Sequence, residues 1–353
     1  LFALFAALCC SCTESGTDEN TDPNGGSNSG QTTPPDPDSD AKDVIHVPKG
    51  GMLAGILNEL GLKSPSSLKL SGTLGVSDFT TLRNIQSLEH LDISRVNLSV
   101  LPTEAFLECT NIKSVILPNT LTAIGTQAFW GSSLVSISIP ASVEEIRGSA
   151  FFGCSSLKTV TFEKGSKLKT VAGFSHCTSL TTIEIPASVE TIGQYAFNDC
   201  TSLHTVTFEK GSKLKTIGSD VFLNCTSLTM IEIPASVETI EDQAFEGCSL
   251  LATVTFEKGS QLKTVDGFSN CTALTTVDMS ACTQVTRIEY RAFYEDSKLQ
   301  LFKIGTRTPP SCGRNVFTGI NSYSVLKVPA GCVDAYKNAT GWKEFTTISE
   351  LDE

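Results

Sequence analysis

Apolar residues recur along most of this chain with a period of about 23 residues. Each copy, or rung, has apolar residues three, six and eight positions after a cysteine, as in Cys177, Leu180, Ile183 and Ile185. The alternation of the last two with polar residues predicts one short strand per rung. A phenylalanine, here Phe174, precedes each cysteine by three residues. The regular rungs start at Cys154, Cys177, Cys200, Cys225, Cys248 and Cys271.

One rung is too short to bury both its strand and its phenylalanine, so neighbouring rungs must stack around one continuous core, as in a solenoid. The loop after the strand alternates between a short form with Pro186 and a form two residues longer at residues 163–167. Two rungs recover this difference by shortening the segment before the phenylalanine, at residues 172–174 and 266–268. With fainter copies on both sides, we expect about ten rungs of 23–25 residues.

Both ends of the array depart from the repeat, as a stacked array requires in order to cover its terminal edges. Residues 44–84 are predicted to form an N-terminal cap, with a helix from the apolar spacing of Leu53, Leu57 and Leu60 and a strand around Leu68 and Leu70. Residues 85–320 then hold the repeats. Residues 321–353 are predicted to form a C-terminal cap with a last strand at 323–329 and a closing helix at 333–342.

The first 43 residues have a different composition from the repeats. Residues 1–12 are predicted to be a lipoprotein signal segment with a truncated start, because an apolar run leads directly into Cys9, Cys10 and Cys12. Cys12, which follows the small Ser11, is the expected lipidation site, and the alternative is an ordinary cleaved signal without lipid. Residues 13–43 hold eight acidic residues against Lys42 alone and almost nothing apolar, so we expect a disordered acidic tether.

Charge and motif content narrow the classes of function. The chain has 353 residues and a net charge of −12, and its repeat region is mildly acidic without a basic block, so nucleic acid is not expected as a partner. The cysteines are whole rungs apart and the four histidines are scattered, so we expect no metal site and no cofactor. Buried free thiols are favoured, but disulfides between stacked rungs stay open. No catalytic motif occurs, and we expect no enzyme.

The residues between the apolar strand positions point away from the core and form two polar columns on the predicted sheet. Threonine dominates both columns, and an acidic residue interrupts the second at every second rung. The plain interpretation is a solvated strand face, for which threonine is well suited. The functional interpretation is a partner-binding face made of Thr159, Thr161, Thr182, Glu184, Thr205, Thr207, Glu232, Thr253, Thr255, Thr276 and Asp278.

The rung from Cys177 to Phe197 resembles the BspA-like leucine-rich repeats of anaerobic gut and oral bacteria, and the segment around Val328, Tyr336 and Trp342 is similar to their C-terminal closure. The resemblance implies a leucine-rich repeat solenoid: a curved, right-handed, β-dominated stack with a parallel sheet on its concave face. It also implies a monomeric, lipid-anchored outer-membrane or cell-surface lipoprotein, adhesin-like, that contacts a host or cell-surface protein. The family has no fixed binding residues to transfer. The alternatives are a glycan-capture accessory lipoprotein and a structural envelope spacer.

Overall fold

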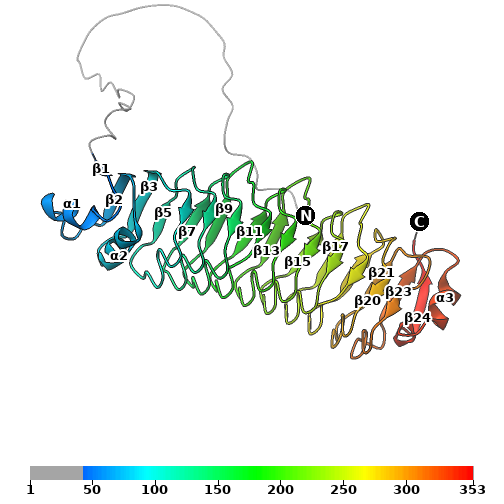
Figure 1. Ribbon diagram of the computed structural model, residues 1–353. Coiled ribbons are helices and arrows are strands. Elements are labelled where there is room, and N and C mark those ends of the chain that lie inside the picture. The colour runs from blue at the N-terminus through cyan, green and yellow to red at the C-terminus, as the bar shows by residue number, and fades with distance from the viewer. Residues whose placement is uncertain (1–42, 353) are drawn as a thin grey trace, which may run out of the picture. The chain divides into compact units, whose positions relative to one another are not determined.

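The computed structural model describes residues 43–352. The predicted signal segment, with Cys12, and the predicted tether up to residue 42 lie outside the described residues. Within residues 43–352, successive rungs place their strands side by side in an elongated stack, with α1 (Leu53–Glu59) and α2 (Val76–Asn84) at one end and α3 (Val333–Asn338) at the other (Figure 1). This is the parallel-strand leucine-rich repeat solenoid that the sequence predicted, with about 13 turns where about ten rungs were expected.

The first strands of the rungs pair in parallel in two consecutive sheets, which together we call the strand face. The first sheet contains β1 (Val44–Val47), β2 (Ser67–Gly72), β3 (His90–Val96), β5 (Ser114–Ile116), β7 (Ser136–Ile139), β9 (Thr159–Phe162), β11 (Thr182–Ile185) and β13 (Thr205–Phe208). The second contains β15 (Met230–Ile233), β17 (Thr253–Phe256), β19 (Thr276–Met279), β21 (Leu301–Ile304), β23 (Val325–Val328) and β24 (Thr347–Glu350).

Ten rungs carry a second, two-residue strand, so the prediction of one strand per rung is wrong. These strands form a separate parallel sheet: β4 (Val100–Leu101), β6 (Ala123–Ile124), β8 (Glu145–Ile146), β10 (Thr170–Val171), β12 (Thr191–Ile192), β14 (Thr216–Ile217), β16 (Thr239–Ile240), β18 (Thr264–Val265), β20 (Arg287–Ile288) and β22 (Ser311–Cys312). Two residues are too few to show an alternating pattern, which explains the error. The ten predicted rungs correspond to the ten rungs that carry a second strand. The remaining turns lie at the two ends of the stack.

The core contains a continuous column of phenylalanines, one per rung. Their rings are buried and stack nearly parallel from Phe106 to Phe293, with centroids of successive rings 4.7 to 5.7 Å apart. Beside them runs a column of cysteines. The Cys225 thiol, for example, donates to the carbonyl oxygen of Phe197 in the preceding rung at 3.2 Å. All ten cysteines in the described part of the chain are free thiols, which answers the question that the sequence left open.

Helix α1 and strand β2 follow in the predicted order, but α2 was not predicted. Its buried Asp78 accepts hydrogen bonds from the backbone N–H groups of Gly51, Leu53 and Gly75 at 2.6, 2.9 and 2.8 Å, and so ties the two helices together. At the other end, α3 is followed by a 3₁₀ turn (Trp342–Glu344). The predicted last strand, β23, is not the last, because β24 pairs with it in parallel. None of the helices within residues 43–352 has the length and apolarity to cross a bilayer.

Candidate functional site

The strand face holds all eleven residues that the sequence predicted as a contact surface. Strand register aligns them into columns: Thr182 lies beside Thr205, and Glu184 beside Thr207. In the second sheet, Glu232 lies beside Thr255, which lies beside Asp278. The side chains are exposed on β9, β11, β13 and β15 but half-buried on β17 and β19, where Thr253, Thr255, Thr276 and Asp278 lie. The accessible residues of this predicted surface therefore lie on β9 to β15.

Asp278 differs from the other two acidic residues of its column. Lys303 on β21 forms an ion pair with it at 2.8 Å, and the Ser280 hydroxyl donates to it at 2.6 Å. Burial raises the pKa of Asp278, but the hydrogen bonds from Lys303 and Ser280 outweigh burial, so this pKa lies below its ordinary value. The negative charge of Asp278 is thus compensated by Lys303 within the protein. The prediction missed Lys303, although following the column one rung further would have found it.

Glu184 and Glu232 keep free carboxylates. Both are exposed, and neither forms a hydrogen bond or ion pair with another residue in the described range 43–352. They lie two rungs apart, about 10 Å at the usual strand spacing. That distance is too long for the two carboxylates to share a proton or a metal ion. Between and beside them, Thr205, Thr207 and the half-exposed Met230, with 59% of its surface accessible, continue the same face.

The alternating loops make the edge of the strand face uneven. In the longer loops, the first residue is a glutamate that accepts a hydrogen bond from the preceding short loop: Glu163 from the Ala141 N–H at 3.2 Å and Glu209 from the Ala187 N–H at 2.9 Å. Between these two long loops lies a recess of about 270 Å³ above the short loop with Pro186. The recess is lined by Val160, Thr161, Phe162, Glu163, Lys164, Glu184, Pro186 and Glu209.

This recess joins two predicted residues, Thr161 and Glu184, to one apolar residue that the sequence placed in the core. Phe162 ends β9 at an apolar strand position, yet it is only partly buried, whereas the corresponding Phe256 is buried. The recess therefore combines an aromatic ring with an unpaired carboxylate. No sequence signal distinguishes Phe162 from Phe256, because the two rungs have the same Thr-Val-Thr-Phe strand.

The ladder of hydrogen bonds between the strands of the strand face is interrupted between β13 and β15. Glu209 and Glu257, which follow strands β13 and β17, donate their N–H to Ile185 and Ile233 of the preceding rung at 2.9 and 3.0 Å. A proline occupies this position after β7, β11 and β15 and has no N–H to donate. Accordingly, β11 pairs with β9 at one position, while β13 and β15 belong to different sheets. From β7 to β17, the strand face therefore consists of rungs joined in tight pairs.

No group of three histidine, cysteine or acidic side chains suitable for a metal ion occurs in residues 43–352. The accessible residues carry hydroxyl groups that repeat from rung to rung. Among them lie two free carboxylates and one recess that contains an aromatic ring. These groups are suited to non-covalent contacts along a surface.

The geometry of the repeat agrees with comparisons to known proteins. The family model for the BspA type leucine-rich repeat region matches residues 77–173, 170–300 and 264–348. The chain belongs to this BspA-type family. No curated protein sequence is significantly similar to the chain.

Solved structures show that the BspA-type rungs here follow a known solenoid. A leucine-rich repeat protein from Bacteroides ovatus is 21% identical and aligns over 88% of this chain and 92% of its own, with a TM-score of 0.50. A leucine-rich cell surface protein from Faecalibacterium prausnitzii is 24% identical over 60% of this chain and 72% of its own, with a TM-score of 0.36. The pneumococcal vaccine antigen PcpA is 18% identical over 82% and 80%, with a TM-score of 0.39. The first of these three supports the shared fold.

Proposed function

We propose that this protein is a non-enzymatic, adhesin-like binding protein that contacts a host or cell-surface protein through its strand face. The observation that supports this most is the exposed stretch from β9 to β15, where Glu184 and Glu232 have no partner within the described chain. An evenly spaced surface of hydroxyls and carboxylates favours extended contact with another macromolecule. A single catalytic centre would instead require one position that differs from its neighbours.

The chemistry of the face limits the kind of partner. Two free carboxylates about 10 Å apart would pair with basic side chains at a similar spacing on the partner. The recess beside Glu184 would accept one apolar side chain against Phe162. Exposed charge pairs contribute mainly to association rate and orientation, whereas the buried apolar contact contributes most of the affinity. The expected partner is therefore a protein surface with basic residues around one apolar anchor.

The strand-face proposal is tested with the triple variant Thr205→Ala, Thr207→Ala and Glu232→Gln. We expect it to weaken binding of a host matrix protein at least tenfold, about 1.4 kcal/mol, without changing the melting temperature. A control variant with Thr126→Ala and Glu144→Gln changes similar exposed residues beside β6 and β8, in the sheet of two-residue strands, and should bind normally. Equal binding by the two variants would move the contact away from the strand face. If substitutions anywhere on the strand face left binding unchanged, the result would favour a structural envelope spacer.

We propose in addition that the protein is held at the outer membrane or cell surface by a lipid on Cys12 and acts as a monomer. The support is the sequence order of an apolar run, Cys12 and a polar acidic segment. Cys12→Ser should abolish incorporation of a labelled fatty acid when the full chain is expressed in a bacterium that processes lipoproteins. Label retained in the variant would point to Cys9 or Cys10.

A further inference from the structure

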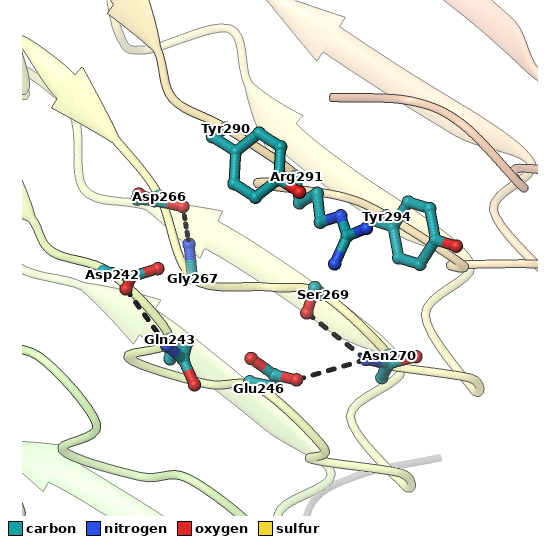
Figure 2. Close-up of a pocket in the computed structure, with 10 residues that line it drawn as sticks. All are labelled: Asp242, Gln243, Glu246, Asp266, Gly267, Ser269, Asn270, Tyr290, Arg291 and Tyr294. Atoms are coloured by element: carbon teal, nitrogen blue, oxygen red, sulfur yellow. Dashed lines mark hydrogen bonds between the residues drawn. The ribbon is translucent and has the colours of Figure 1, made fainter. Parts of the chain in front are cut away.

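A second recess lies on the segments that follow the second strands, away from the strand-face columns. It exists because one rung is shortened at Asp266 and Gly267, while the rungs on either side keep the full segments 241–245 and 289–293. Gly267 has φ +85°, and a Cβ added there would lie 2.3 Å from the backbone nitrogen of Ala244. Only glycine allows the chain to pass so close to the preceding rung. The missing residues leave a recess of about 270 Å³ (Figure 2).

The shortening also removes hydrogen-bond partners. In regular rungs, the N–H of the residue two positions before the core phenylalanine donates to a carbonyl of the next rung, as Asp220 does to Asp242 at 3.0 Å and Arg291 to Arg314 at 3.1 Å. The equivalent N–H of Gln243 has no partner within residues 43–352, because the residue that would accept it is deleted. Gln243 therefore brings a free donor to the lining of the recess.

Asp266 brings an unpaired acceptor. Its side chain lines the recess and is more than nine-tenths buried. One oxygen, Oδ1, accepts the Gly267 N–H at 2.7 Å, and Oδ2 has no hydrogen bond to the described residues (Figure 2). Oδ2 keeps some contact with solvent, unlike the Asp296 oxygen that is buried without a partner. It is therefore available to a ligand that donates a hydrogen bond.

Two tyrosines and an arginine close the other side of the recess. The Arg291 guanidinium lies between the rings of Tyr290 and Tyr294, 5.0 and 4.6 Å from their centroids, and no carboxylate of the described chain forms an ion pair with it (Figure 2). The guanidinium N–H groups of Arg291 are therefore held in place without forming an ion pair in the described chain. Tyr290 is 50% exposed and presents aromatic surface at the rim. On the opposite side, the Asn270 amide donates to Glu246 at 3.3 Å.

The recess thus offers free donors, free acceptors and an aromatic ring within a volume just below the range of about 300 to 1,000 Å³ typical of drug-sized ligands. A ligand with several hydroxyls, each both donor and acceptor, satisfies this set better than a purely cationic or anionic group. The carboxylates of Asp242 and Glu246 repel an anion, and Arg291 already occupies the space between the rings that a cation would take. We propose that this recess binds one uncharged sugar ring of a glycan.

This proposal does not depend on the strand-face contact, since the two surfaces share no residue. The structure also supplies an internal control. The rung at Ala172 and Gly173 is shortened in the same way, with Gly173 at φ +91°, but an alanine replaces the aspartate and Tyr195 stands at the position of Arg291. The shortening of the rung is therefore repeated without the polar groups that we assign to sugar binding.

The test is binding of methyl glycosides of glucose, galactose, mannose and N-acetylglucosamine to the full chain, measured by ligand-observed NMR up to about 10 mM, the range expected for a single ring. Glucuronate and cadaverine are included as anionic and cationic probes. We expect at least one neutral glycoside to bind, with at least tenfold weaker binding by Tyr290→Ala and by Asp266→Ala. Tyr195→Ala, which removes a half-exposed tyrosine beside the other shortened rung, should bind as the unchanged protein does.

Three outcomes overturn the proposal: no neutral glycoside binds, only a charged probe binds, or binding survives both Tyr290→Ala and Asp266→Ala. Tyr290 is half-exposed, so its variant is expected to fold even if Asp266→Ala does not, and melting curves check this. Because these variants leave β9 to β15 unchanged, failure here leaves the strand-face proposal standing.

Discussion

At the scale of single residues, two positions break the regularity of the core. The cysteine column is interrupted by Ser132, whose hydroxyl lies 3.4 Å from the Cys154 thiol, and by Asp296, which is fully buried. Asp296 accepts the Cys271 N–H at 2.9 Å through Oδ1, but its Oδ2 has no partner. Burial raises the pKa of Asp296 well above its ordinary value, because burial disfavours the charged form of the carboxyl.

Replacing Asp296 with the consensus cysteine should stabilise the protein. In Asp296→Cys, the Cys271 N–H can return to the carbonyl of its own turn, as the Cys248 N–H donates to Phe245 at 3.2 Å, and the unpaired oxygen disappears. We expect the free energy of unfolding to rise by about 1 to 3 kcal/mol, measured by urea denaturation. A loss of stability would show that the Asp296 to Cys271 hydrogen bond outweighs the cost of the unpaired oxygen.

Asp266 predicts a pH dependence of stability. Burial, together with the nearby Asp242, Glu289 and Glu246, raises its pKa to about 7, against about 3.9 in an unfolded chain; Arg291 is the one cation lining the recess. The folded state therefore holds a proton that the unfolded state releases, and stability falls as the pH rises from about 4 to 7. Asp266→Asn should match the unchanged protein near pH 4 and exceed its stability above pH 7, by no more than about 2 kcal/mol because solvent screens the partly open carboxyl. The same difference at both pH values would contradict this account.

At the scale of the element, the loop after each strand decides how tightly neighbouring strands pair. Pairs such as β11 with β13, and β15 with β17, have four aligned positions each, because a glutamate N–H follows the second strand of the pair. Where proline follows instead, one ladder bond is lost. At the β13 to β15 junction, the Ser227 hydroxyl compensates in part by donating to the Thr201 carbonyl at 2.6 Å.

This difference between junctions predicts local opening between β13 and β15. Amide hydrogens of β13 and β15 should exchange faster than those of β17, because β13 and β15 each lack a ladder partner on one side. Hydrogen exchange followed by mass spectrometry of peptides covering residues 203–257 would measure this. Equal protection of the three strands would indicate that the phenylalanine and cysteine columns alone hold the rungs together.

At the scale of the whole molecule, each rung contacts chiefly its neighbours, so the ends decide whether the array stays closed. The C-terminal end is covered by α3 and the following 3₁₀ turn, where the fully buried Trp342 lies 5.3 Å from the Phe317 ring and 4.9 Å from the Tyr336 ring. Its indole N–H donates to the Pro310 carbonyl at 3.0 Å. Trp342 thus joins the cap to the last rungs.

Trp342→Ala should cost about 3 to 5 kcal/mol, because it leaves a large cavity and an unpaired Pro310 carbonyl under the cap. Tyr323→Ala, at a residue that is 85% exposed in the same segment, serves as the control and should change stability by less than about 0.5 kcal/mol. Thermal denaturation with size-exclusion chromatography measures both stability and association. A similar cost for the two variants would mean that the cap does not close the array.

The sequence by itself determined the solenoid, the polar columns and the buried phenylalanines and cysteines, because each follows from a pattern that repeats along the chain. It did not reveal the second strand, which is too short for a pattern, nor helix α2, which depends on Asp78 bonding to residues 25 to 27 positions away. Only the tertiary structure showed that Phe162 is partly open and that shortening one rung at Asp266 creates a polar recess. These facts depend on contacts between rungs, where small departures from the repeat matter most.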